Sequence, residues 1–254
     1  MHRRIDNAIS RIVGVMKEWG SIDSVACLQP VADPYDPYFF LSFDIYHAGD
    51  VPESAERERL LGDVGAFEAA SSGLKDRFFV GDIPVRLEFK SKESIDRLVA
   101  AAAGGQLLPR EAGTYVFYRL VNAEISFQIS SWLDDTRATL SELPDAFWEH
   151  LADRQRSAAE HLFGDLAAAA ARSDELYFTV SAGRFVAVVC SLLFTVNKRF
   201  EPSGRNLAAE VSQLHALPQS LAADMDAFVS DNDRPSMERR AKLAELMLQS
   251  AFSL

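Results

Sequence analysis

The chain has 254 residues, of which 48% are hydrophobic and 25% are charged, and its formal net charge is −11. This composition is ordinary for a globular protein with one large or two modest domains. The acidic balance argues against an extended, non-specific contact with nucleic acid, because phosphates need clustered lysine and arginine. It leaves room for one nucleotide in a local basic pocket.

Cysteine content and apolar runs bear on the compartment of the protein. Cys27 and Cys190 are the only cysteines, and they form neither a metal-ligand motif nor a disulfide framework, so we expect a reduced, cytoplasmic environment. Residues 1–14 are basic but lack a sustained apolar core, so we expect no signal peptide. The longest apolar run, residues 185–196, is shorter than the ~20 residues that span a bilayer and predicts a buried helix.

The first half of the chain mixes helix and strand patterns. Residues 4–19 carry apolar side chains at helical spacing up to Gly20, which predicts an amphipathic helix. Apolar, β-branched and aromatic runs then predict short strands. The last of these runs, residues 115–129, also fits helical spacing. We therefore expect strands at residues 24–29, 38–47, 77–80, 84–90 and 115–129, and helices at residues 4–19, 54–70 and 91–103.

Strand patterns end near residue 140, and the second half of the chain is predicted to be helical. The expected helices lie at residues 144–171, 174–199, 206–214, 221–229 and 236–250. Strands followed by helices indicate an α+β fold, with an N-terminal mixed sheet and flanking helices followed by an all-helical C-terminal bundle. We place the border between a domain of residues 1–140 and a helical domain of residues 141–254.

Two acidic residues stand inside apolar strand patterns. Asp44 interrupts the run of residues 38–47, and Glu88 interrupts residues 84–90. Burying a carboxylate is costly unless it meets a metal, a cation or a network of donors. Two such strands could bring their carboxylates together on one sheet, as in the divalent-metal sites of phosphoryl and nucleotidyl transfer. The alternative is that each acid lies on the solvent face of a half-exposed strand.

The neighbours of these acids follow from the two-residue period of a strand. Asp44 should share a face with Ser42 and Tyr46, and Glu88 should share a face with Arg86 and Lys90. One interpretation is a polar ladder whose charges pair with each other. The other is a metal-binding acid flanked by cations that hold phosphate oxygens.

The order of elements resembles the nucleotidyltransferase superfamily, especially its two-domain bacterial members related to aminoglycoside and lincosamide nucleotidyltransferases. In that family a Gly-Ser turn follows the first strand, an Asp-x-Asp pair lies on the next, and a third carboxylate lies on a later strand. Residues 42–46, with Asp44, are similar to the Asp-x-Asp region, and residues 87–89, with Glu88, to the third position. Residues 193–203, LFTVNKRFEPS, resemble a segment of the family's helical domains.

The resemblance implies an enzyme that transfers a nucleoside monophosphate from NTP and Mg²⁺ to a small-molecule acceptor. Asp44 and Glu88 would bind the metal or activate the acceptor hydroxyl. Arg86, Lys90 and Lys198 would neutralise the triphosphate, and the helical domain would shape the acceptor pocket. If so, Asp44→Asn and Glu88→Gln should each abolish a magnesium-dependent stabilisation by NTP while leaving the fold intact.

The sequence also departs from the family pattern. LQPV, at residues 28–31, stands where the Gly-Ser turn is expected, and Tyr46 stands at the second acid of the pair. Asp33 or Asp36 could supply a missing oxygen ligand. The second hypothesis is therefore a degenerate relative without activity, which binds a nucleotide or a protein partner. A third is a structural or oligomerisation module. None of the three involves extended nucleic acid or a membrane.

A weaker candidate lies in the helical half. Arg156 and His161 have the Arg-x₄-His spacing of a ribonuclease motif that occurs in helical domains often partnered with nucleotidyltransferases. The same predicted helix carries many other charged residues, so an exposed, solvated face explains the pair equally simply.

Overall fold

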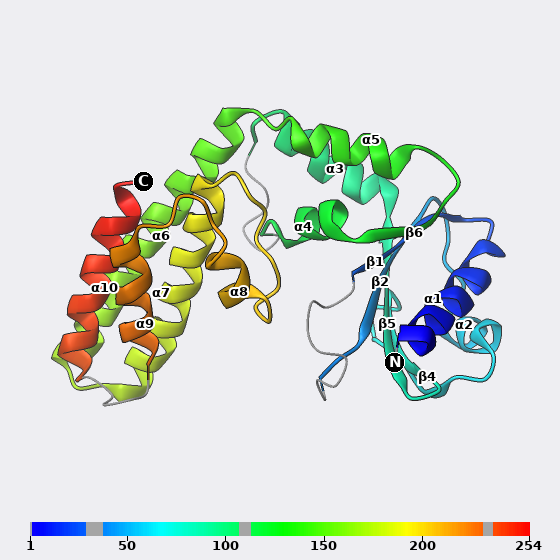
Figure 1. Ribbon diagram of the computed structural model, residues 1–254, viewed down its shortest axis with the longest axis horizontal. Helices are drawn as coiled ribbons and strands as arrows, with labels where there is room; N and C mark the ends of the chain where they lie inside the picture. Colours follow the sequence, from blue (N-terminus) through cyan, green and yellow to red (C-terminus); the bar gives the residue numbers. More distant parts are fainter. Residues whose placement is uncertain (1, 29–37, 107–112, 231–235) are drawn as a thin grey trace. The chain divides into compact units, whose positions relative to one another are not determined.

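The computed structural model describes residues 2–28, 38–106, 113–230 and 236–254 (Figure 1). Within these residues the six strands are β1 (Ile22–Leu28), β2 (Leu41–His47), β3 (Gly65–Ala69), β4 (Lys75–Val80), β5 (Ile83–Ser91) and β6 (Glu124–Gln128). The helices are α1 (His2–Lys17), α2 (Ser54–Leu61), α3 (Lys92–Ala103), α4 (Tyr115–Asn122), α5 (Trp132–Ser141), α6 (Asp145–Ala171), α7 (Glu175–Val196), α8 (Leu207–Val211), α9 (Gln219–Val229) and α10 (Met237–Phe252).

All six strands form one mixed sheet in the order β3-β4-β5-β2-β1-β6. The central pair, β2 and β5, is parallel, and every other neighbouring pair is antiparallel. The elements that the structure describes after β6 are all helices. The predicted α+β fold, a mixed sheet with flanking helices followed by a helical C-terminal region, is confirmed.

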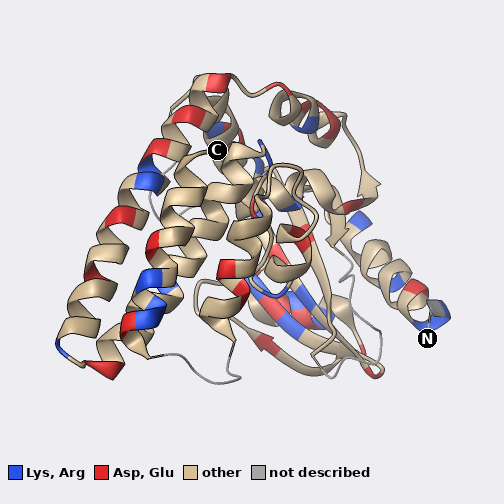
Figure 2. Ribbon diagram, turned by 60° about the vertical axis from the view of Figure 1, so that its left-hand side comes forward, with Lys and Arg blue, Asp and Glu red and all other residues tan. Residues whose placement is uncertain are grey.

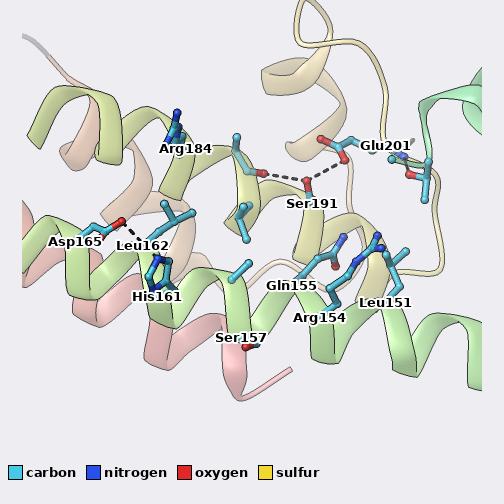
Figure 3. Close-up of a pocket in the computed structure, with 15 residues that line it drawn as sticks. Leu151, Arg154, Gln155, Ser157, His161, Leu162, Asp165, Arg184, Ser191 and Glu201 are labelled. Carbon is cyan, nitrogen blue, oxygen red and sulfur yellow. Dashed lines mark hydrogen bonds and ion pairs between the residues drawn. The ribbon is translucent and has the colours of Figure 1, made fainter. Parts of the chain in front are cut away.

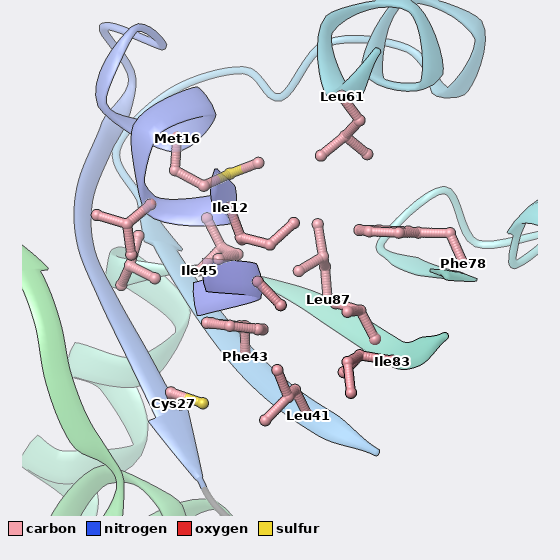
Figure 4. Close-up of a cluster of buried hydrophobic side chains, with 14 of the residues drawn as sticks. Ile12, Met16, Cys27, Leu41, Phe43, Ile45, Leu61, Phe78, Ile83 and Leu87 are labelled. Carbon is pink, nitrogen blue, oxygen red and sulfur yellow. The ribbon is translucent and has the colours of Figure 1, made fainter. Parts of the chain in front are cut away.

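One face of the sheet is apolar and packs against α1 and α2 (Figure 4). Helix α1 presents Ile12 and Met16 to the sheet, because its apolar residues recur every three or four positions. Phe43 and Ile45 of β2 point into the same layer and are fully buried. Each such side chain contributes roughly 1.5–3 kcal/mol on burial. The other face is thereby left to the polar residues that alternate with these.

A second core joins the long helices of the C-terminal half. It is built by buried residues of α6, α7, α9 and α10, such as Leu166, Phe185, Phe228 and Met247. Helix α7 contains the apolar run at residues 185–196, and most of that run is buried, as predicted. By length and composition, α7 is the one described helix that could cross a membrane, and half of its most apolar window is buried inside the fold.

The chain divides into two compact units. The first contains Met1–Ala103 and Arg119–Glu142, and the second contains Gly104–Tyr118 and Leu143–Leu254. The division therefore passes through α4, between Tyr118 and Arg119. The later crossing, after Glu142, falls two residues from the border that we place at residues 140 and 141. The division into domains of residues 1–140 and 141–254 stays a prediction.

Two of the predicted elements are wrong in part. The helix expected at residues 54–70 ends as α2 at Leu61, because Gly62 adopts a positive φ of 72° that stops the helix. The remainder becomes β3, an edge strand exposed at most positions, which has no alternating apolar pattern to reveal it. The strand expected at residues 115–129 is helix α4 followed by β6, and the helical spacing of its first half prevails. Helix α5 has no counterpart among the predicted elements.

A buried ion pair fastens α2 to the sheet. Arg57 donates from Nε and Nη2 to the two carboxylate oxygens of Asp76, each at 2.7 Å, and both side chains have at most 2% exposure. Nη1 donates to the Pro52 carbonyl at 2.6 Å, and the guanidinium lies 5.0 Å from the Phe89 ring. Because nearly every donor has a partner, the pair can be buried without an orphaned charge.

We predict that Asp76→Asn lowers the free energy of unfolding by about 3–5 kcal/mol, because it leaves the Arg57 guanidinium buried without a counter-charge. The matched control is Asp82→Asn, whose carboxylate pairs with Arg4 at an exposed site and should cost less than about 1 kcal/mol. Chemical denaturation measures both values. Equal losses in the two variants would contradict the role of the buried pair.

Candidate functional site

The polar face of the sheet brings together most of the residues expected at the site. In the parallel ladder of β2 and β5, Asp44 lies opposite Glu88, and Tyr46 lies opposite Lys90. Residues directly opposite each other in a ladder point to the same face, so both carboxylates share one side of the sheet. Arg86 lies two positions before Glu88 on β5 and opposite Ser42. The expected convergence of two acidic strands is therefore present.

Asp44 is fully buried and is held by two cations. Lys90 Nζ lies 2.8 Å from Oδ1, and Arg119 Nε donates to Oδ2 at 2.6 Å. The Lys90 and Arg119 side chains are themselves only 13% and 5% exposed. The two ion pairs offset the desolvation that a bare carboxylate would suffer at the centre of a sheet.

Tyr46 completes the surroundings of Asp44. Its hydroxyl lies 3.4 Å from Asp44 Oδ2. Burial raises the pKa of Tyr46 well above its usual value, and the negative charge of Asp44 raises it further. The phenol therefore stays protonated and acts as a donor, whereas the second aspartate of an Asp-x-Asp pair would be an anionic ligand.

Glu88 is less buried than Asp44 and is also paired. Lys75 Nζ lies 2.7 Å from Oε1, and Lys90 Nζ lies 3.7 Å from Oε2. The Glu88 side chain is 34% exposed to solvent. Lys90 thus bridges the two carboxylates, in the place where a metal shared by Asp44 and Glu88 would have to bind.

The described residues at this face do not fit a magnesium ion. No group of three or more His, Cys, Asp or Glu in the described part of the chain is arranged to hold a metal. Mg²⁺ needs several oxygen ligands in octahedral geometry, but the oxygens of Asp44 and Glu88 already face Lys75, Lys90 and Arg119. A divalent cation at this position would meet three positive charges.

Further cations lie along the same face toward the sheet edge. Arg77 of β4 lies directly opposite Arg86 of β5, and Lys75 lies opposite Glu88. The Arg86 guanidinium is stacked 3.8 Å from the Phe40 ring centroid. Figure 2 shows basic and acidic positions side by side on these neighbouring strands. The arrangement of charges thus suits an anionic ligand better than a cation.

The remaining expected residues lie elsewhere. Lys198 belongs to the second unit, where it pairs with Asp145 at 2.6 Å. It adopts a positive φ of 51° directly after α7, in a turn where Arg199 N donates to the Phe194 carbonyl at 2.9 Å. Asp33, Asp36 and most of the turn at residues 28–31 lie outside the described residues.

The segment at residues 193–203 has packing roles in the second unit. Leu193 and Phe194 are buried in its core. The Asn197 side chain donates to the Leu193 and Ala216 carbonyls and accepts from Ala216 N at 2.7 Å. Phe200 stacks on Trp148. These contacts account for much of the segment without a ligand.

Arg156 and His161 both lie on α6 in contact with solvent, and His161 also lines a groove between α6 and α7. Arg156 pairs with Asp153 at 3.2 Å, and the His161 side chain is 80% exposed and lies 3.9 Å from Asp165. This geometry favours the interpretation as an exposed charged face.

Arg119 is the main residue that sequence reasoning missed. It stands alone among the apolar and aromatic residues of α4, YVFYRLVN, where a strand pattern hides the helical face. A buried arginine implies a buried acid as its partner. Two features of the sequence could have indicated Arg119: residues 115–129 also fit helical spacing, and Asp44 is an acid in an apolar run that needs a buried partner.

Comparisons with known proteins bear on the fold. A family model described as a domain of unknown function, DUF4037, matches residues 114–205, which include Arg119 but less than half of the chain. No match was found among curated proteins. The crystal structure of a nucleotidyltransferase-like protein from Exiguobacterium sibiricum is similar, with a TM-score of 0.52 and 10% identity, over 98% of this chain and 74% of that chain. The chain therefore has a nucleotidyltransferase-like fold.

The geometry predicts a large structural effect of Asp44. Asp44→Asn should lower the free energy of unfolding by about 3–5 kcal/mol, because Arg119 and Lys90 then lose the buried carboxylate that they share, and Lys90 keeps only the more distant Glu88. Glu88→Gln should cost less than about 1 kcal/mol, because Glu88 keeps contact with solvent. Denaturant titration of the two variants measures the difference. An Asp44→Asn protein as stable as the parent would instead support a metal ligand whose removal leaves the fold intact.

Proposed function

We propose that this protein is a degenerate relative of the nucleotidyltransferases that binds the phosphate groups of a nucleotide without a metal ion and does not transfer nucleoside monophosphate. The observation that carries this proposal is the direct cross-strand pairing of Arg77 with Arg86. Like charges at opposite positions of a ladder repel each other. A bound anion removes this repulsion and gains charge-assisted hydrogen bonds from both guanidinium groups.

The balance of charge on the polar face supports an anionic ligand. Cations outnumber carboxylates among the described side chains there: Lys75, Arg77, Arg86, Lys90 and Arg119 against Asp44, Glu68 and Glu88. Glu68 lies opposite Arg77 in the ladder, yet these two residues form no ion pair within 4.0 Å. In a chain with a net charge of −11, this excess of positive charge marks a local site.

Aromatic side chains near the arginines favour a nucleotide over inorganic phosphate. Phe79 of β4 lies two positions after Arg77, on the same face of the sheet, and is 42% exposed. Phe40 carries the stacked Arg86 guanidinium. A base can stack on an exposed aromatic ring while its phosphates reach Arg77 and Arg86.

A second candidate is the enzymatic transfer of a nucleoside monophosphate from NTP and Mg²⁺ to a small acceptor. The direct register of Asp44 and Glu88 on neighbouring strands favours it. This activity would require Asp44 to exchange Lys90 for a metal, and Asp33 or Asp36 to supply further oxygen ligands. Because Asp44 is already held in ion pairs, enzymatic transfer is the less favoured of the two candidate functions.

The test is calorimetric titration with ATP and GTP, in EDTA and again in millimolar Mg²⁺. We expect binding that is the same or stronger in EDTA, because free triphosphate carries more negative charge than its magnesium complex. Arg77→Gln should weaken binding about tenfold, the equivalent of one charge-assisted hydrogen bond. The matched control is Arg97→Gln, which removes the same charge from an exposed position on α3.

Binding that requires Mg²⁺ and is lost in Asp44→Asn or Glu88→Gln would overturn the proposal in favour of the enzyme. Equal affinity in Arg77→Gln and the parent would remove the arginine pair from the site. Absence of nucleotide binding in the parent protein would leave the protein-interaction alternative in its place.

A further inference from the structure

A groove of about 1050 Å³ runs between α6 and α7 within the second unit (Figure 3). Its volume is at the upper end of the range of small-molecule sites, about 300–1,000 Å³. Apolar side chains such as Leu151, Leu162 and Val188 line it, and Thr114 and Glu201 also contribute. None of these residues belongs to the polar face of the sheet, so the groove is a separate candidate site.

Glu201 places a poorly solvated carboxylate in this groove. Its backbone N–H donates to Thr114 Oγ1 at 2.9 Å, which fixes the residue beside the groove. Burial raises the pKa of Glu201, and a hydrogen bond with Ser191 opposes this effect. Among the residues the structure describes, no lysine, arginine or histidine forms an ion pair with Glu201. The carboxylate therefore lacks the cation that Asp44 and Asp76 both have.

The hydrogen bond from Ser191 satisfies Glu201 only in part. Ser191 Oγ lies 2.8 Å from Glu201 Oε2 and 3.0 Å from the Ala187 carbonyl. A hydroxyl has one proton, so it donates to only one of these oxygens at a time. A carboxylate has about four lone-pair positions, and within the described part of the chain the Ser191 hydroxyl is the side-chain donor that reaches those of Glu201.

Gln155 adds a second acceptor on the opposite wall. Its Oε1 atom is buried and has no hydrogen-bond partner among the residues that the structure describes. Figure 3 shows Gln155 on α6 and Glu201 after α7 at the same end of the groove, beside Ser191. A buried acceptor without a donor costs about 1–3 kcal/mol. Both groups would be satisfied by one ligand that carries several donors.

We propose that this groove binds a small organic molecule with a protonated amino group, which donates to Glu201 and Gln155 while its apolar part lies along Leu151 and Val188. An ammonium group supplies three donors and the positive charge that the carboxylate lacks. Arg154 and Arg184 also line the groove. An anionic ligand bound to these two arginines would leave the acceptor oxygens of Glu201 and Gln155 without donors. The two acceptors therefore favour a positively charged ligand.

The test compares three probes of one shape: phenylbutylamine, phenylbutanol and phenylbutanoate. In calorimetric or NMR titrations of the full chain, we expect the amine to bind at least about tenfold more tightly than either analogue. Glu201→Gln should abolish this preference by weakening only the amine, because it removes the charge but keeps the shape of the side chain. The matched control is Glu160→Gln, an exposed residue of α6 outside the groove.

Several outcomes would overturn the proposal. These are equal binding of amine and alcohol to the parent protein, no amine binding at millimolar concentration, or an unchanged preference in Glu201→Gln. The probe series on the parent protein decides the matter even if a variant fails to fold. Arg77→Gln should leave amine binding unchanged, so the result is independent of nucleotide binding at the sheet.

Discussion

The Asp44 carboxylate lies on the central strand β2 with no exposure to solvent, and it must be neutralised there. Lys90 reaches it from the parallel strand β5, and Arg119 reaches it from α4. These two contacts tie a neighbouring strand and a helix from later in the chain to one buried charge. The polar face of the sheet is therefore organised around ion pairs, whereas the opposite face is held by apolar packing against α1 and α2.

The same constraint decides which chemistry the face can support. The sequence resemblance implied acids that face a metal, but here cations occupy the oxygens of Asp44 and Glu88. With those acids paired, Arg77 and Arg86 lie directly opposite each other as like charges at the same face of the sheet. The proposed anion site and the poor fit of a metal ion thus follow from the same arrangement of charges. The fold alone would have suggested the opposite ligand.

The fold class and the shared polar face of the two acidic strands could be predicted from the sequence. The position of Asp44 and Glu88 inside apolar runs indicated strands that share a polar face, and the order of elements indicated the fold class. The identity of the partner could not be predicted, because Arg119 lies 75 residues from Asp44 in the chain, and only the tertiary fold joins them. Edge strand β3 escaped prediction because its exposed side chains carry no apolar period. Glu201 lies within the segment of residues 193–203 that the sequence singled out, but its burial could not be predicted, because it depends on tertiary packing.

We infer that Asp44 is a structural anchor and not a metal ligand. The decisive measurement is a double-mutant cycle of Asp44→Asn and Arg119→Gln, followed by denaturant unfolding with and without Mg²⁺. We expect a coupling energy of about 2–3 kcal/mol that Mg²⁺ does not change. A coupling below about 0.5 kcal/mol, or a parent protein that Mg²⁺ stabilises through Asp44, would contradict it.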